Sequence, residues 1–235
     1  MGCWVTLQAV FERNETVMTV KKMALGFSAL VGGALVATAA WAQGGAIADR
    51  LFAVAEDKHS LNEVVFTSKA SIVRFTGRTS KMSGAATINV QDATKASGNV
   101  KVDLASLDTG ISLRNEHMRG VLETEKFPAA TFTFRGIKLA KKTLTPNAPV
   151  SGTANGQMTL HGVTRTISAP VELTYLPEQD ANYRPGDWVH VNARFKLKMS
   201  DYGIQLPKPV LGVKVADEIE LDVDGMAAAS AGEQK

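Results

Sequence analysis

The sequence predicts an all-β protein with an antiparallel sheet, and three observations support this class. First, apolar and polar residues alternate along most of the chain after Ser60, which is the period of a strand with one buried face. Second, the sequence lacks the long apolar runs and amphipathic helices that a parallel sheet requires. Third, short turns such as His161–Val163 separate the alternating segments.

Each expected strand follows from its own alternation. Val100, Val102 and Leu104 share one face of the segment 97–107, while charged residues occupy the positions between them. The same period gives a set of eight or nine strands, expected at 61–67, 71–77, 84–90, 97–107, 130–137, 154–161, 166–176, 188–200 and 217–225. Between Leu107 and Phe127 the alternation stops. We expect a short helical segment near 114–125, ending near Gly120 or before Pro128.

Eight or nine strands favour a closed barrel, because closure removes the exposed edges and turns the apolar faces inward. A two-sheet sandwich fits the alternation equally well. The bulky residues of the inward set favour a barrel of about eight strands, which can hold one small apolar ligand. A fully packed core without a cavity gives the same pattern and stays an open alternative.

The first 42 residues are predicted to be a secretory signal peptide. Lys21 and Lys22 precede the uncharged run Met23–Ala42, which ends in Ala-Trp-Ala and has the order of a cleaved signal. An uncleaved membrane anchor is the alternative, since a run of this length can span a bilayer. Met18 is an alternative start of translation, because the acidic residues before it suit a signal poorly.

The predicted organisation follows from cleavage after Ala42. We expect a lead-in or linker at 43–59, a β-barrel domain at 60–224 and a flexible tail at 225–235. The location is then periplasmic or secreted. Cys3, the only cysteine, lies before the cleavage point, so the mature chain has neither a disulfide nor a thiolate nucleophile.

The charge of the chain argues against a nucleic-acid partner. The formal net charge is +3, and the basic residues are scattered instead of forming the stripe that a phosphate backbone requires.

The stretch Ser106–Gly120 is the densest polar segment and allows several interpretations. Glycoside hydrolysis would need two carboxylates, with Asp108, Glu116, Glu123 and Glu125 as possible donors, but acidic residues this dense more often form a solvated helix face. A metal site around His117 would need a second histidine at helical or strand spacing, which the sequence lacks. We therefore expect no enzyme, no cofactor and no metal. The simpler interpretation is a barrel cap in which Asp108 and Thr109 bond backbone N–H groups and Asn115 caps a following helix. Such a cap can still contact the polar end of a ligand.

Four segments of the chain resemble the YceI-like family of lipid-binding (polyisoprenoid-binding) proteins. They are LDTGISLRNEHMRGVLETEKFPAATFTF (107–134), GQMTLHGVTRTISAPVEL (156–173), FKLKMSDYGI (195–204) and VADEIELDV (215–223). The resemblance covers most of 60–224. It implies an extended lipocalin-like antiparallel barrel with an internal cavity for an amphiphilic lipid, on a protein that is usually exported. Met199 stands where the family commonly carries an arginine.

The alternation of inward and outward side chains along each strand, which we call strand parity, gives candidate contacts for the ligand's tail, and side-chain chemistry gives those for its head. For the apolar tail of a bound isoprenoid or other long-chain lipid they are Phe75, Val102, Leu104, Phe132, Phe134, Phe195, Leu197 and Met199. For a polar head such as a phosphate they are Arg114, His117, Arg119 and Tyr202.

The predicted function is an exported protein that holds an isoprenoid or similar lipid. The alternative is a non-carrier interaction module of the same fold, acting in a membrane redox or stress-response system. A transient membrane or membrane-protein contact and a homodimer are further expectations.

Overall fold

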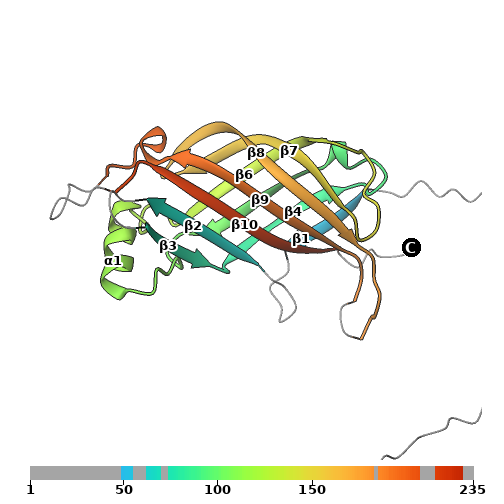
Figure 1. Cartoon of the computed structure of the whole chain (residues 1–235), viewed down its shortest axis with the longest axis horizontal. Helices are drawn as coiled ribbons and strands as arrows, with labels where there is room; N and C mark the ends of the chain where they lie inside the picture. The colour runs from blue at the N-terminus through green and yellow to red at the C-terminus, as the bar shows by residue number, and fades with distance from the viewer. Residues whose placement is uncertain (1–48, 55–61, 70–73, 183–184, 207–214, 230–235) are drawn as a thin grey trace, which may run out of the picture. The chain divides into compact units, whose positions relative to one another are not determined.

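The computed structural model describes residues 49–54, 62–69, 74–182, 185–206 and 215–229, which form strands, one α-helix and two short 3-10 helices (Figure 1). The predicted all-β class is confirmed. In chain order the elements are β1 Arg50–Val54, β2 Glu63–Lys69, β3 Arg74–Thr79, β4 Met82–Ile88, η1 Ala93–Lys95, β5 Ser97–Asp103, α1 Ser112–Val121, β6 Ala129–Leu139, β7 Pro149–Leu160, β8 Val163–Leu176, β9 Trp188–Lys198, η2 Met199–Tyr202 and β10 Glu218–Ala229.

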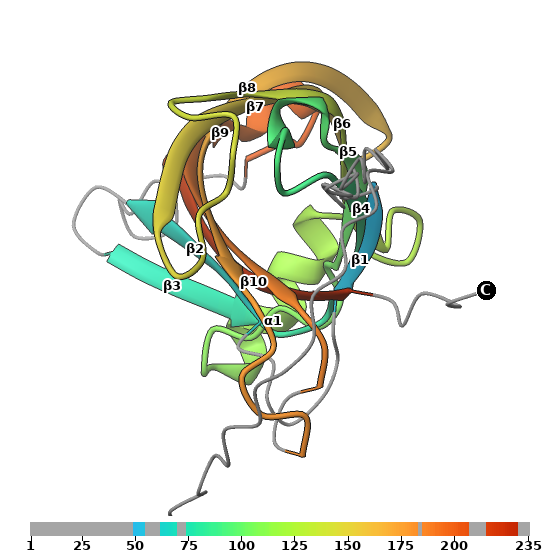
Figure 2. The same ribbon diagram turned by 90° about the vertical axis from the view of Figure 1, so that its right-hand side faces the viewer.

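Eight of the strands close into an antiparallel barrel. They are hydrogen-bonded in the order β1, β4, β5, β6, β7, β8, β9 and β10, and β10 pairs again with β1. Figure 2 looks along this ring, with α1 at the end farther from the viewer. The barrel predicted from the alternation is therefore confirmed.

Strand β10 changes its partner halfway along one edge. Residues 219–224 pair with β2, whereas 227–229 pair with β1. Between these two ladders, the backbone N–H of Met226 donates to the side-chain oxygen of buried Asn62 at 2.8 Å. The Asn62 side chain thus pairs the backbone N–H of Met226, which neither β1 nor β2 reaches. Beyond the end of β1, the hairpin β2–β3 continues the barrel wall.

The hairpin is tied back to the barrel through the loop after β5. The backbone N–H groups of Arg78 and Asp108 each donate to the carbonyl of the other at 2.9 Å. This single antiparallel bridge places the loop, and the helix that follows it, at the β2–β3 end of the barrel.

One strand was not expected from the sequence, and another is longer than expected. β1 lies within the segment 43–59, because Phe52 is fully buried although its five-residue strand is too short to show a clear period. β10 continues to Ala229, into the segment expected to be a flexible tail. The alanines 227–229 carry little apolar signal, but their backbone pairs with both β1 and β9.

Helix α1 begins and ends earlier than the expected segment 114–125. Its N-cap residue is Ile111, which has an extended backbone and gives no side-chain cap. Asn115 was expected to cap the helix, and this expectation is wrong, since Asn115 lies in its first turn. The helix ends after Gly120, one of the two predicted ends.

The side chains inside the barrel form two clusters. The β1 cluster includes Phe52, Ile88, Ile137, Leu173 and Val189, together with Ala93 of η1 and Ala96 just after it. The second, which we call the α1 cluster, has the buried members Phe66, Leu104, Leu107, Ala130, Met158, Leu160, Leu197, Met199, Tyr202 and Ile204, and α1 packs against it through Met118 and Val121. A packed group of residues thus lies toward each end of the barrel.

Candidate functional site

A cavity of about 170 Å³ lies inside the barrel, with walls from β1 and from β4 to β10. Its described lining residues include no Lys, Arg, His, Asp or Glu, and Asn99 and Thr131 alone among them carry polar side chains. The large lining side chains are Phe52, Met82, Ile88, Phe132, Phe134, Ile137, Met158, Leu173, Phe195 and Met226. An apolar chain is the ligand that such a lining accepts without leaving a buried polar group unpaired.

Small residues keep this interior open. Ala154 on β7 and Ala169 on β8 are direct cross-strand partners, and both line the cavity. A Cβ atom at Gly156 would lie 2.7 Å from the Phe132 ring and 2.4 Å from the Thr133 carbonyl oxygen. Glycine at this position therefore lets the ring lie close against the wall. The rings of Phe132 and Phe134 stack with centroids 6.0 Å apart.

The structure places four of the predicted tail contacts in the cavity wall. They are Val102, Phe132, Phe134 and Phe195. The other predicted apolar contacts lie in or against the α1 cluster instead: Leu104, Leu197 and Met199 are buried there, and Phe75 packs on them half-buried. Parity correctly put these side chains on the inner face, but they fill the end of the barrel and do not line the cavity.

The predicted polar contacts are spread over the same end of the molecule. Arg114 places its guanidinium carbon 5.3 Å from the centre of the Phe75 ring, a cation–π contact. His117 is exposed, Arg119 is half-exposed, and Tyr202 is buried in the α1 cluster. Within the described residues, no contact joins these four side chains into one anion-binding site.

The loop before α1 is held by its own side chains. The Asp108 carboxylate accepts hydrogen bonds from the Gly110 N–H at 2.8 Å and from the Asn115 side chain at 2.6 Å. Asn115 in turn accepts from the Thr109 N–H and hydroxyl, at 2.8 and 2.7 Å. The bonds from Asn115 and then Gly110 hold the pKa of Asp108 below its ordinary value. The predicted turn bond of Asp108 is confirmed, while Thr109 donates to a side chain.

The segments that carried the family resemblance meet at this end of the barrel. In the hairpin turn after β7, the His161 ring lies 4.6 Å from the ring of Phe127, and its Nδ1 lies 3.3 Å from the Tyr202 carbonyl oxygen. Arg165 donates to the Asp201 carbonyl at 2.9 Å. Residues from three of the four motifs thus build one structural cap.

The fourth motif is attached to the same cap. The carboxylate of Asp217 accepts from the Ser200 N–H at 2.8 Å and from its hydroxyl at 2.6 Å. The Ser200 bonds hold the pKa of Asp217 below its ordinary value. These contacts show that residues of the four motifs touch one another in the folded protein. Most of them hold the cap in place.

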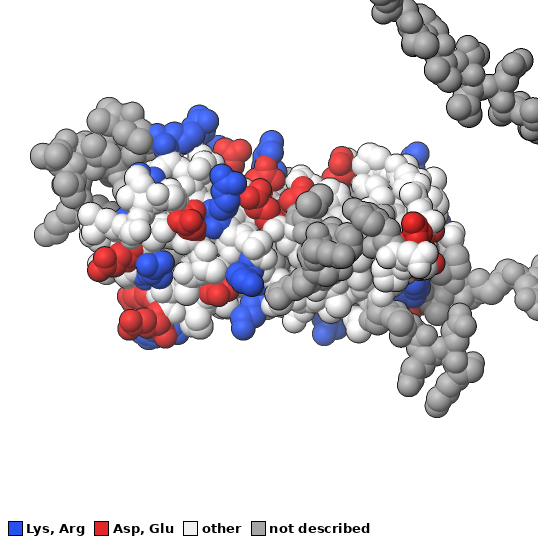
Figure 3. Space-filling view, turned by 90° about the horizontal axis from the view of Figure 1, so that it is seen from below, with Lys and Arg blue, Asp and Glu red and all other residues white. Residues whose placement is uncertain are grey.

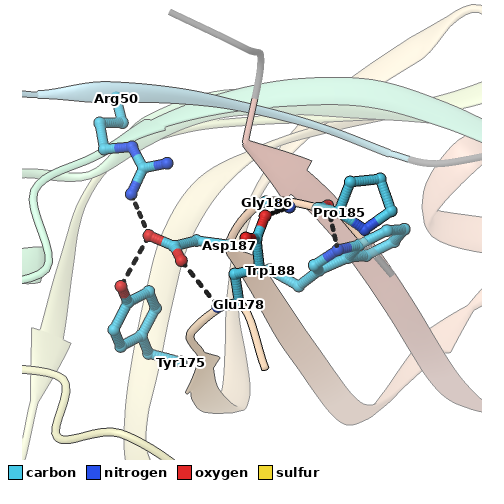
Figure 4. A network of polar contacts seen from close by, with 7 residues as sticks. All are labelled: Arg50, Tyr175, Glu178, Pro185, Gly186, Asp187 and Trp188. Atoms are coloured by element: carbon cyan, nitrogen blue, oxygen red, sulfur yellow. Dashed lines mark hydrogen bonds and ion pairs between the residues drawn. The ribbon is translucent and has the colours of Figure 1, made fainter. Parts of the chain in front are cut away.

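A polar network fixes the opposite end, near β1 (Figure 4). The Asp187 carboxylate pairs with the Arg50 guanidinium and accepts from the Tyr175 hydroxyl at 2.7 Å and from the Glu178 N–H at 2.9 Å. Burial alone would raise the pKa of Asp187, but the bonds from Glu178, Arg50 and Tyr175 lower it below its ordinary value. Burial and the nearby carboxylate raise the pKa of Tyr175. The network ties β1 to the loop between β8 and β9.

Asp187→Asn is expected to destabilise the protein by about 1–3 kcal/mol at pH 7, because it removes a charge-assisted acceptor. The lowered pKa means that the carboxylate stabilises the fold above pH ~4 and loses this effect as the pH falls through its folded-state pKa. Urea unfolding of both proteins at pH 7, 4 and 2.5 measures the difference, which should shrink toward acid. Asp180→Asn, in the same loop, is the control. A difference independent of pH would contradict this account.

The surface shown in Figure 3 carries basic and acidic side chains side by side, without a broad area of one sign. On the outer face of β9 and β10, Arg194 pairs with Asp222, and the Lys196 ammonium lies 2.8 Å from the Glu218 carboxylate. In the described part of the chain, no helix is long and apolar enough to cross a membrane. The predicted signal peptide and its cleavage site lie outside the described residues.

The protein is a closed antiparallel barrel with an apolar interior. This is the architecture of lipocalin-like proteins. A sequence profile of the YceI-like domain matches residues 54–227, so the chain belongs to the YceI-like family. A UPF0312 protein of Shewanella sp. (strain ANA-3) is 27% identical over 205 residues, covering 85% of this chain and 96% of the relative. A UPF0312 protein of Vibrio parahaemolyticus is 29% identical over 156 residues, covering 64% and 73%.

Solved structures share the fold. BcnA of Burkholderia cenocepacia is 22% identical with a TM-score of 0.57, covering 71% of this chain and 96% of that protein. A polyisoprenoid binding domain from Saccharophagus degradans, implicated in plant cell wall breakdown, is 18% identical with a TM-score of 0.56, covering 78% of this chain and all of that domain. At these identities the likeness establishes the common barrel.

Proposed function

We propose that this protein is an exported carrier that holds an isoprenoid or a similar amphiphilic lipid inside its barrel. The observation that carries the proposal is the cavity, whose described lining is apolar and uncharged. Each CH₂ group that leaves water for such a site contributes about 0.8 kcal/mol. A chain of several isoprene units therefore binds favourably even after the cost of ordering it.

The size of the cavity indicates how a long chain would fit. Its volume of about 170 Å³ is close to that of apolar cavities of about 150 Å³ that hold benzene. A longer chain requires lining side chains to move. Met82, Met158 and Met226 all line the cavity, and methionine adapts readily because its side chain is unbranched and flexible.

Two further observations support the proposal. The polyisoprenoid binding domain from Saccharophagus degradans has the same barrel fold. The order of Lys21, Lys22 and the uncharged run Met23–Ala42 supports export to the periplasm or the exterior.

A second candidate is an interaction module that contacts a membrane or membrane protein without carrying lipid. The start of α1 favours it, because Ile111 and Leu113 are 49% and 60% exposed. Large apolar side chains exposed this close together in the chain are typical of contact surfaces. The two candidates differ in what the purified protein contains.

Native mass spectrometry separates them. The full chain is exported in its native host, purified without detergent, weighed intact and then extracted with organic solvent. A stoichiometric extra mass that extraction releases as an isoprenoid or acyl compound is expected. A protein without added mass, which also fails to take up farnesol, would reject the carrier function and leave the interaction module. The mass of the polypeptide itself reports whether cleavage follows Ala42.

A further inference from the structure

Two buried hydroxyl groups lack hydrogen-bond partners within the described part of the chain. They belong to Tyr202, which is 2% exposed, and Ser68, which is 1% exposed. Leaving a buried polar group unpaired costs about 1–3 kcal/mol, so such groups are few in native proteins and call for an explanation. A ligand atom that forms a hydrogen bond with these hydroxyls is one explanation.

Both hydroxyls lie toward the α1 end of the barrel interior. Ser68 on β2 is opposite Ile219 on β10, and Ile219 is opposite Leu197 on β9. Leu197 and Tyr202 are both members of the α1 cluster, and Ile219 packs against that cluster. The register thus places Ser68 at the level of the cluster that contains Tyr202.

This end of the interior adjoins the cavity. Phe132 and Met158 line the cavity and also belong to, or pack against, the α1 cluster. Ser68 and Tyr202 do not line the cavity themselves, so a ligand reaches their hydroxyls only when side chains of the α1 cluster, such as flexible Met158, move.

The charges around the α1 cluster favour an uncharged polar group on the ligand. The buried polar or charged residues described in the protein are Asn62, Ser68, Thr79 and Thr124, none of them a cation. The Arg114 guanidinium lies over the Phe75 ring, and Arg165 donates to the Asp201 carbonyl. A phosphate buried here would have no buried Lys or Arg beside it. The mostly buried ring of His161 at this end already has its Nδ1 at the Tyr202 carbonyl, so burying a phosphate is costly. Burial raises the pKa of Tyr202, so its hydroxyl remains a donor at neutral pH.

We propose that the hydroxyls of Tyr202 and Ser68 bind the uncharged polar end of the lipid, a hydroxyl or carbonyl group, while its chain occupies the cavity. The inference rests on the proposed carrier function and narrows the ligand to neutral amphiphiles. Of the four polar contacts expected for a phosphate head, Arg114, His117, Arg119 and Tyr202, the proposal keeps Tyr202 alone and places recognition inside the barrel.

The test combines two variants with two probes. Tyr202→Phe and Ser68→Ala each delete one hydroxyl and keep most of the side chain. Farnesol and the hydrocarbon farnesene share a fifteen-carbon isoprenoid skeleton, but only farnesol carries a hydroxyl. Dissociation constants for each combination form a cycle that isolates the hydrogen bond from general packing. Thermal unfolding of each variant shows that it is folded.

Each deletion is expected to weaken farnesol binding about fivefold to tenfold, the effect of one neutral hydrogen bond, and to leave farnesene binding unchanged. Farnesyl monophosphate should bind the wild type more weakly than farnesol. Equal farnesol affinity in the wild type and both variants would overturn the inference and leave the carrier function intact. A wild-type protein that binds neither farnesol nor farnesene would overturn both.

Discussion

Ala169→Phe is expected to weaken farnesol binding roughly 100-fold. Ala169 is 3% exposed and lines the cavity opposite Ala154, so the wall carries two small side chains at this level. A phenyl ring at this position occupies space that the ligand chain needs. Excluding three or four CH₂ groups from the cavity removes about 3 kcal/mol, which corresponds to the stated loss.

The effect on binding is measured by titration with farnesol, with urea unfolding in parallel. Thr166→Phe is the matched control, since Thr166 lies on the same strand with its side chain exposed. It adds the same ring to the outer face and should leave the affinity unchanged. If both variants bind farnesol like the wild type, the chain does not occupy the cavity.

Phe52→Ala is expected to lower the free energy of unfolding by about 3–5 kcal/mol. Phe52 is completely buried, belongs to the β1 cluster, and lies on the strand that closes the barrel between β4 and β10. Its removal enlarges a cavity that already exists and weakens the packing of a strand of only five residues. Both effects act on the closure of the ring.

Urea denaturation measures this loss. Leu51→Ala is the control, because Leu51 is the adjacent residue on the opposite face and is 50% exposed. Its replacement should change stability by less than about 0.5 kcal/mol. A loss below about 1 kcal/mol for Phe52→Ala would show that β1 does not contribute to the core as its burial indicates.

The alternation of the sequence predicted most strands because each has one buried and one wet face. In β9, for example, Ala193 and Leu197 are buried while Arg194 and Lys196 pair with acids on β10. The same signal could not locate β1, whose five residues include exposed Leu51, or the end of β10, whose alanines have little contrast with polar neighbours. Backbone pairing with neighbouring strands, and not a side-chain pattern, forms β1 and the end of β10.

The candidate site could be predicted only in part, because parity gives the face of a residue but not its level along the barrel. Phe195 and Leu197 share the inner face of β9, yet one lines the cavity and the other packs in the α1 cluster. The contribution of Phe52 depends on β1, which the sequence did not reveal. Met158 lines the cavity but was not among the predicted contacts. It lies on a predicted strand, so the alternation with its neighbours could have placed it on the inner face.

The helix and its charges show a different limit. Arg114 was predicted to contact a polar head, and the structure places it over the ring of Phe75. Asn115 was expected at the start of the helix, whereas it folds back to bond Thr109. These contacts depend on which residues the loop brings together. A spacing pattern carries no information about them.

The most direct test of the account is to locate the bound chain by photo-crosslinking. Farnesol with a diazirine on its chain is bound to the purified protein and irradiated, and the labelled residues are identified by mass spectrometry. Labelling of Phe132, Met158 or Phe195, whose side chains line the cavity, is the predicted result. Labelling confined to outward residues such as Thr133 and Lys196 would contradict a lipid inside the barrel.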